Sequence, residues 1–194
     1  MHLNAFIIIL ILAVNASALE IEVSKEDWVN AGEEDIKAVL HSAASAIYKH
    51  CLNTRIDPML VHRRFDYPQA NHDRDSSGRI VIGLQTGDKY WAQYAYQFSH
   101  EFCHVLAGHS NDWRKKWRSL DTPHLWFEEC LCEVASLFTL RSMGQSWVID
   151  PPYPNWRSFA PNLAQYAQDR IDDPEHALPV DETFQKWFQI NEKE

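Results

Sequence analysis

Hydrophobic and polar residues follow two different periods along the first hundred residues. Residues 19–23 alternate in the manner of a β-strand, whereas the apolar residues in 33–52 recur at helical spacing. Residues 59–65 and 79–84 are two further strand candidates, and a turn-forming run at 71–78 precedes the second of them. The pattern therefore predicts the order strand, helix, strand, strand, helix.

The second half of the chain is predicted to be largely helical. One helix is expected from near Asp88 to Ala107, with Gly108 as its stop, and another over residues 126–143, ended by Gly144. The remaining segments are a polar connection at 110–123, a rigid proline-rich loop at 150–154, and weaker helical patterns at 161–171 and around Phe184, Trp187 and Phe188. The pattern indicates no second domain.

The N-terminal segment has the features of an export signal. Residues 3–14 are apolar apart from Asn4, and Ala16-Ser17-Ala18 matches a cleavage site before Leu19. The apolar run is too short for a comfortable membrane span, but the lack of Lys and Arg before it leaves an uncleaved anchor as an alternative. We expect a signal peptide at 1–18, a single domain at 19–194, and a secreted or periplasmic protein that meets a membrane only if the segment stays uncleaved.

The net charge of −9 lies entirely within residues 19–194, because the first 18 residues contain no Asp, Glu, Lys or Arg. A domain this acidic is not expected to bind nucleic acid. The local exception is a basic cluster interleaved with two tryptophans: Arg114, Lys115, Lys116, Arg118, Trp113 and Trp117. We interpret the cluster as a solvated helix face, and a patch for an acidic partner or a membrane surface is the alternative.

An exported protein is expected to pair some of its cysteines, which are Cys51, Cys103, Cys130 and Cys132. Three complete pairings exist. A bond between Cys103 and Cys132 would pin together the two helices predicted above, whereas the alternative is that all four are buried small apolar residues. Cysteine ligation of a metal is less favoured, because no CxxC spacing occurs.

Residues 73–78 look like the first half of a calcium-binding loop, with oxygen ligands at alternate positions and a glycine at the turn. The twelfth position of such a loop would be Leu84, where a bidentate Glu is required. An ordinary polar turn before a strand is therefore the preferred interpretation.

The strongest chemical signal is the sequence His-Glu-Phe-Cys-His at residues 100–104. On a helix of 3.6 residues per turn, His100 and His104 lie on one face, so both imidazoles can reach one metal ion. Glu101 stands at the edge of that face, in the position of a general base for a metal-bound water.

The next predicted helix offers the carboxylates that such a site still lacks. Glu129 and Glu133 lie one turn apart, so one can bind the metal while the other orients a ligand imidazole. Three protein ligands, His100, His104 and one carboxylate, would leave a fourth position for water, as at a catalytic zinc site.

These two segments resemble the gluzincin zinc metallopeptidases, to which thermolysin and the zinc aminopeptidases belong, and more closely the small peptidase domains described as MA-like. The resemblance rests on HExxH and on the tryptophan and acids of residues 126–133, and it covers residues 80–141. It implies an α+β, zincin-like domain in which a small mixed sheet supports the HExxH helix and a second helix carries the third ligand. It also implies Zn2+ as cofactor, Glu129 as third ligand and Glu133 as the acid that holds a ligand histidine. Two features depart from the family: 24 residues separate His104 from Glu129, and Cys130 stands where glycine is usual.

Alternatives remain open at several positions of the site. Glu128 is a rival third ligand, since it is only one residue away from Glu129. His109 would be the third ligand in a metzincin-like motif, but the glycine falls one residue late and the histidine one residue early. The sequence offers several donors for a developing oxyanion without ranking them: Tyr153, Tyr166, His124 and His176.

The function expected from these residues is peptide-bond hydrolysis by a metal-activated water, with Glu101 as general base and a peptide or protein as substrate. The resemblance implies that the strand at 80–85 is the edge strand on which an extended peptide lies. An endopeptidase is favoured, because aminopeptidases of the resembling group carry an acidic motif on this strand, and residues 80–85 contain no acid that would anchor a free amino terminus. The alternatives are a zinc amidase acting on cell-wall material and a non-catalytic zincin-fold protein that presents tryptophans to a partner: Trp113, Trp117, Trp147 and Trp156.

Overall fold

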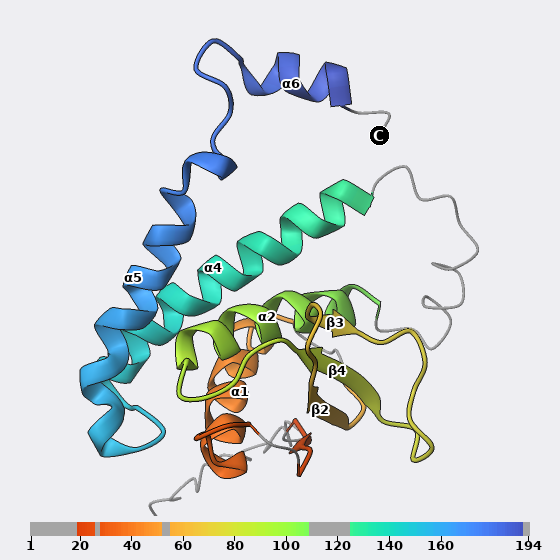
Figure 1. Cartoon of the computed structure of the whole chain (residues 1–194), viewed down its shortest axis with the longest axis vertical. Coiled ribbons are helices and arrows are strands. Elements are labelled where there is room, and N and C mark those ends of the chain that lie inside the picture. Colours follow the sequence, from red (N-terminus) through yellow and green to blue (C-terminus); the bar gives the residue numbers. More distant parts are fainter. Residues whose placement is uncertain (1–18, 26–27, 52–54, 109–124, 192–194) are drawn as a thin grey trace, which may run out of the picture.

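The chain folds into a small sheet and a set of helices, and the computed structural model describes residues 19–25, 28–51, 55–108 and 125–191 (Figure 1). In chain order the elements are β1 (Ile21–Val23), α1 (Glu33–Tyr48), β2 (Met59–Arg63), β3 (Gln69–Ala70), β4 (Ile80–Leu84), α2 (Trp91–Ala107), α4 (Leu125–Ile149), α5 (Ala160–Ile171) and α6 (Phe184–Asn191), with short 3-10 helices at Pro154–Phe159 and Pro174–His176. The sheet contains parallel and antiparallel pairs. The predicted α+β class with a small mixed sheet is therefore confirmed.

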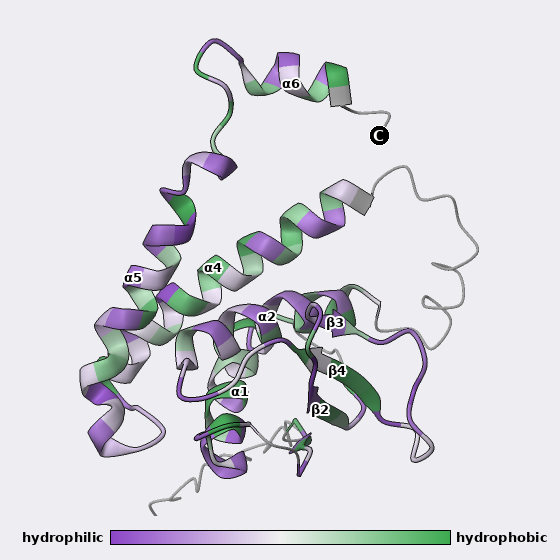
Figure 2. Ribbon diagram, viewed as in Figure 1, coloured by the Kyte–Doolittle hydropathy of each residue, from purple (hydrophilic) through white to green (hydrophobic). Residues whose placement is uncertain are grey.

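The strands of the sheet lie in the order β1-β2-β4-β3. β2 runs parallel to both of its neighbours and places Met59 opposite Ile21 on one side and Ile80 on the other. β3 runs antiparallel to β4 and pairs Ala70 with Ile82. All residues of β4 are buried, and Figure 2 shows this strand as hydrophobic. A continuous apolar run of this kind is expected of a strand that is covered on both faces.

The position of β4 corrects one expectation. The prediction that residues 80–85 form the edge strand is wrong, because β3 covers the free side of β4. β3 gives no signal in the sequence, since its two residues, Gln69 and Ala70, are too few to show an alternating pattern. The edge of the sheet next to α2 is therefore β3 rather than β4.

Core packing decides which face of α2 carries the HExxH residues. Phe98 and Phe102 are fully buried and stack with their ring centroids 5.5 Å apart. Burial of side chains of this size stabilises a fold by roughly 1.5–3 kcal/mol each. His100 and His104 lie on the opposite side of the helix, because each is two positions from a buried phenylalanine. The packing of the phenylalanines thus turns both histidines away from the core.

α4 is longer than the sequence pattern indicates. The prediction that Gly144 ends this helix is wrong, because α4 continues through Gly144 to Ile149. A Cβ atom at Gly144 would lie 3.1 Å from the Cβ of Ala164 and 3.2 Å from the carbonyl oxygen of Ala160. The glycine therefore allows α4 and α5 to cross closely, which is a packing role rather than a stop signal.

The turn before β4 is held by one carboxylate. The Asp75 carboxylate accepts hydrogen bonds from the backbone N–H groups of Ser77 and Arg79, both at 2.9 Å, and from Nε of Arg79 at 2.7 Å. Gly78 has a φ of +82°, which glycine adopts without strain. The residues thus form a polar turn in which protein donors already use the Asp75 oxygens.

Parts of two expectations lie outside the described residues. The predicted signal peptide at 1–18 is one, and the basic cluster around Arg114 to Arg118 is the other. Within the described part of the chain, no helix combines the length and the apolar character needed to cross a membrane.

Candidate metal centre

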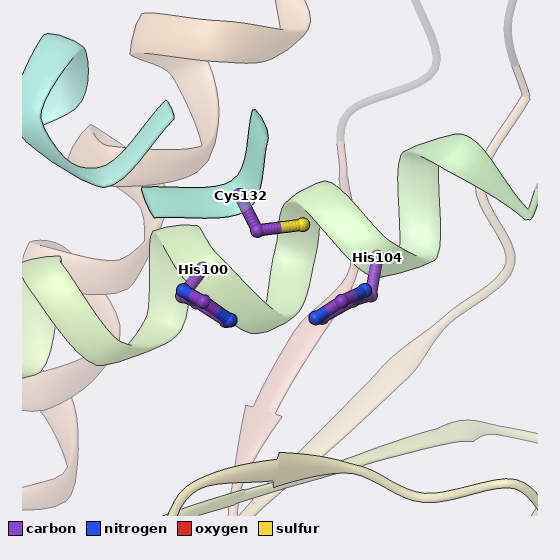
Figure 3. A group of neighbouring side chains, drawn as sticks. All are labelled: His100, His104 and Cys132. Carbon is purple, nitrogen blue, oxygen red and sulfur yellow. The ribbon is translucent and has the colours of Figure 1, made fainter. Parts of the chain in front are cut away.

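Two imidazoles of α2 form the base of the site. His100 and His104 lie one helical turn apart, and their ring centroids are 5.1 Å from each other. Figure 3 shows both rings projecting from the same side of α2. The helix ends shortly afterwards at Gly108, whose N–H donates to the carbonyl of His104 at 3.1 Å. The structure therefore brings the two predicted histidine ligands together.

Glu129 of α4 meets the Nε2 atoms of both rings. Its Oε2 lies 3.0 Å from Nε2 of His100 and 3.6 Å from Nε2 of His104. One carboxylate oxygen and two ring nitrogens thus converge on a single point. Glu129, the third ligand implied by the resemblance, therefore faces both rings.

The other edge of each ring faces a second carboxylate. Nδ1 of His104 lies 2.7 Å from Oε1 of Glu128, and Nδ1 of His100 lies 3.8 Å from Oε2 of Glu133. A carboxylate on Nδ1 fixes the ring and favours the tautomer that leaves Nε2 free for a metal. Glu128, weighed above as a rival ligand, therefore lies beside the nitrogen of His104 that points away from Glu129.

The excess of carboxylates makes the site attractive to positive charge. Burial alone would lower the pKa of His100, but the Glu129 carboxylate, which is hydrogen-bonded to the ring, and the nearby Glu133 carboxylate outweigh it and raise the pKa to about 10. The hydrogen bond from His100 and the nearby ring of His104 in turn lower the pKa of Glu129 to about 2. A positive charge is thus stabilised between these groups, and a divalent cation would bind in competition with protons.

Glu101 lies in the same cleft but contacts a different element. The residue is only 6% exposed, and this burial raises the pKa of its carboxyl above the ordinary value. Its Oε2 accepts a hydrogen bond of 2.6 Å from the backbone N–H of Ala70 in β3. The edge strand therefore holds one oxygen of the carboxylate in place. A buried carboxylate with a raised pKa is a stronger base than one in water.

The cleft around these groups has a volume of about 410 Å³. This is within the range of sites that bind small molecules or short peptide segments. α2, α4 and the β3 edge all contribute to its lining, which consists of His100, Glu101, His104, Glu129 and Glu133 together with Tyr67, Pro68, Gln69, Ala70, His72, Tyr96 and Gln97.

A cysteine is a further candidate ligand that the sequence reasoning did not favour. The Cys132 sulfur and one nitrogen each of His100 and His104 lie within 4.8 Å of one another, so these three residues can hold a metal ion. Figure 3 shows the Cys132 side chain reaching toward the rings from α4. Cys132 is fully buried, and its thiol lowers the pKa of the neighbouring Cys103. The sequence signal that was available is the spacing, since Cys132 lies three residues after Glu129 on one helix.

The donor atoms fit a transition metal such as zinc. Imidazole nitrogen, carboxylate oxygen and thiolate sulfur are the three zinc ligands found in proteins. Calcium and magnesium would require oxygen ligands in larger number, and the site offers mainly nitrogen around the shared point. Residues from α2 and α4 would thus hold the ion.

The remaining candidates lie elsewhere or outside the described residues. His109 and His124 are outside them. Among the described residues, Tyr153 packs on Trp156 and His176 contacts Arg170, so neither lines the cleft. Tyr166 packs edge-on against Tyr96, and it is Tyr96 that lines the cleft. Tyr96 was missed in the sequence, although it lies one turn before His100 and so shares its face.

Comparisons with protein-family models, with curated proteins and with solved structures find no match for this chain. Function is therefore inferred below from the donor atoms, the cleft and the buried carboxylate.

Proposed function

We propose that the protein is a secreted zinc peptidase of gluzincin type with a zincin-like domain, in which His100, His104 and Glu129 bind the metal. The observation that carries the proposal is the convergence of two Nε2 atoms and one Glu129 oxygen beside a buried carboxylate. Glu101 is the general base, and Glu133 holds the His100 ring through Nδ1. An endopeptidase remains the favoured type.

The reaction is hydrolysis of an amide bond without a covalent intermediate. Zinc, when bound, supplies Lewis-acid activation of water and of the scissile carbonyl. Glu101 accepts the proton of the attacking water and passes it to the leaving amine. Its burial raises its pKa, and the hydrogen bond from Ala70 keeps the carboxylate oriented while the proton moves. General-base catalysis of this kind contributes about 10²- to 10⁴-fold to a rate.

The edge strand β3 offers a way to bind an extended peptide. Its residues line the cleft, and the N–H of Ala70 points into it toward Glu101. Because the N–H and C=O of a strand residue point to the same side, the Ala70 carbonyl also faces the cleft and can accept a substrate N–H. We infer that a substrate chain pairs with β3 and passes Glu101 at the point of cleavage.

A second candidate function is metal binding without catalysis. It is favoured by the His100–His104–Cys132 group, because a thiolate added to the two histidines and Glu129 would give a closed, four-ligand structural site. In one form of this second function, tryptophans on the surface would bind a partner. Trp147 cannot be one of them, because it is fully buried and its indole N–H donates to Ser42. Hydrolysis of cell-wall amides is the same chemistry on another substrate.

The proposal is tested by measuring hydrolysis of a fluorescently labelled unfolded protein by the zinc-loaded chain. Glu101→Gln should retain zinc and lose at least about 100-fold in rate, because the amide cannot accept the proton. Glu34→Gln, the same change at an exposed position of α1, is the matched control and should stay fully active. An active Glu101→Gln variant would remove Glu101 from its role. A zinc-loaded wild type that cleaves neither proteins nor cell-wall amides would instead favour the closed site.

A further inference from the structure

Tyr96 of α2 is hydrogen-bonded to Glu133, the carboxylate that faces Nδ1 of His100. Tyr96 lies one turn before His100, and its hydroxyl is 2.6 Å from both carboxylate oxygens of Glu133. The hydroxyl is the donor of this pair, because an ionised carboxylate only accepts. Burial, the first cause, and the hydrogen bond to Glu133 both raise the pKa of Tyr96 well above its usual range, so the hydroxyl keeps its proton.

An arginine of α5 completes the chain of contacts. Nη2 of Arg170 donates to the Tyr96 oxygen at 3.3 Å, and its guanidinium carbon lies 5.3 Å from the centre of the Tyr96 ring. Arg170 is held in turn by Asp173, at 3.9 Å from Nη1, and by His176, at 3.3 Å from Nη2. A continuous path therefore runs from α5 through Tyr96 and Glu133 to the ring of His100.

Glu133 needs this support for a physical reason. A glutamate side chain has several rotatable bonds, and the Glu133 side chain is 34% exposed, so solvent can compete for its oxygens. The Glu133 contact to Nδ1 of His100 is also the longer of the two carboxylate–imidazole contacts, 3.8 Å against 2.7 Å at His104. A hydroxyl placed equally between both oxygens restricts the carboxylate to the orientation that faces His100.

We propose that Tyr96 and Arg170 are positioning residues of the metal centre: they hold the Glu133 carboxylate toward Nδ1 of His100 and so keep Nε2 of that ring aimed at the metal. The proposal rests on the function proposed above only in taking His100 as a ligand. Arg170 belongs to α5 and acts on His100 only through Tyr96 and Glu133. The proposal therefore gives α5 an indirect role at the metal centre.

The test is a zinc titration against a competing chromophoric chelator, carried out on the full chain and its variants. Tyr96→Phe and Arg170→Met should each weaken zinc binding by about 10-fold, the lower end of what loss of a ligand's hydrogen-bonded partner costs. Arg170→Lys keeps the charge and should recover part of the loss. Tyr166→Phe removes a hydroxyl from the same aromatic cluster, and Arg141→Met removes another arginine contact between α4 and α5, to Gln168. Both controls should bind zinc like the wild type.

A second readout separates positioning from general stability. In the metal-free protein, the ring ¹⁵N signals of His100 should shift in Tyr96→Phe, whereas those of His104, held by Glu128, should stay in place. Unchanged zinc affinity together with unchanged His100 signals in Tyr96→Phe would overturn the proposal. If the wild type binds no zinc, the proposed function fails, and the His100 signals still decide whether Tyr96 orients the ring. If the Tyr96→Phe variant does not fold, the ring ¹⁵N signals of His100 are measured in Arg170→Met and Arg170→Lys instead, and unchanged signals there would overturn the proposal.

Discussion

At the scale of single residues, the two nitrogens of each imidazole have different partners. Nε2 of both His100 and His104 faces Glu129, while each Nδ1 faces a carboxylate of its own. Glu128 and Glu129 are neighbours in the chain, yet a helix separates them by about 100° around its axis, which is enough to give them different roles. Sequence spacing predicted which residues would gather here. It could not choose between Glu128 and Glu129, because the choice depends on how α4 is rotated against α2.

This division of roles predicts unequal losses of zinc affinity. In the proposed site, Glu129→Ala removes a ligand and should weaken zinc binding by more than about 100-fold, whereas Glu128→Ala removes only the carboxylate beside Nδ1 of His104 and should weaken it by about 10-fold. Isothermal titration with zinc in a weakly competing buffer measures both. A larger loss in Glu128→Ala than in Glu129→Ala would show that the ligand assignment is reversed.

The role of the buried Cys132 thiol was the hardest to predict from sequence. Cys132 belongs to no CxxC pair, so burial as a small apolar residue was the simpler interpretation. Only the approach of α4 to α2 shows that its sulfur is near both imidazoles. Tertiary contacts of this kind have no local signal, whereas the HExxH pair has one because both residues belong to a single turn of one helix.

At the scale of elements, the sequence predicted an element's end correctly where nearby residues determine that end. α2 ends at Gly108 as expected, and β2 and β4 fall within their predicted segments. Gly144 misled the prediction because a glycine that stops a helix and a glycine that lets another helix approach look alike in a sequence.

The packing role of Gly144 predicts a cost for any larger residue. Gly144→Val should lower the free energy of unfolding by about 1–3 kcal/mol, because its side chain would press on the backbone of α5 at Ala160. Gln145→Val places the same residue at the next, exposed position of α4 and serves as the control. Denaturation by urea measures both. Equal stability of the two variants would argue against a close crossing of α4 and α5.

The turn before β4 predicts a dependence of stability on pH. The backbone N–H of Arg79, and then its guanidinium, hold the pKa of Asp75 below its ordinary value. A carboxyl whose pKa is lower in the folded state stabilises the fold above its unfolded pKa, and that contribution is lost as the pH falls through the folded value. Asp75→Asn should therefore have a lower Tm than the wild type at pH 7, with a difference that shrinks below about pH 3.8. Thermal scans across this range test it, and a difference independent of pH would contradict the ionic role.

At the scale of the whole molecule, the packing of α4 explains why the ends of this helix were hard to predict. One of its faces packs against α2 and α5 through buried residues: Cys132, Ser136, Leu140, Met143 and Trp147. The opposite face exposes Phe127, Leu131, Val134 and Phe138. A helix with apolar residues on both sides has no single hydrophobic stripe, so its period gives little information about where it begins and ends.

The global arrangement also explains which parts of the fold the sequence could supply. Alternation and helical spacing are local, so they predicted most elements, whereas the α+β class was implied by the resemblance. The strand order is a property of long-range pairing. Its decisive feature, the two-residue β3 between β4 and the cleft, was therefore found only in the structure.

The metal content of the purified protein decides whether the two imidazoles and the Glu129 carboxylate form a metal centre. Elemental analysis by mass spectrometry should find one zinc ion per chain in the wild type, and Glu129→Ala purified in parallel should contain far less. A wild-type protein without stoichiometric divalent metal would contradict the account, because the two imidazoles and the Glu129 carboxylate would then form an ion-pair cluster rather than a metal centre.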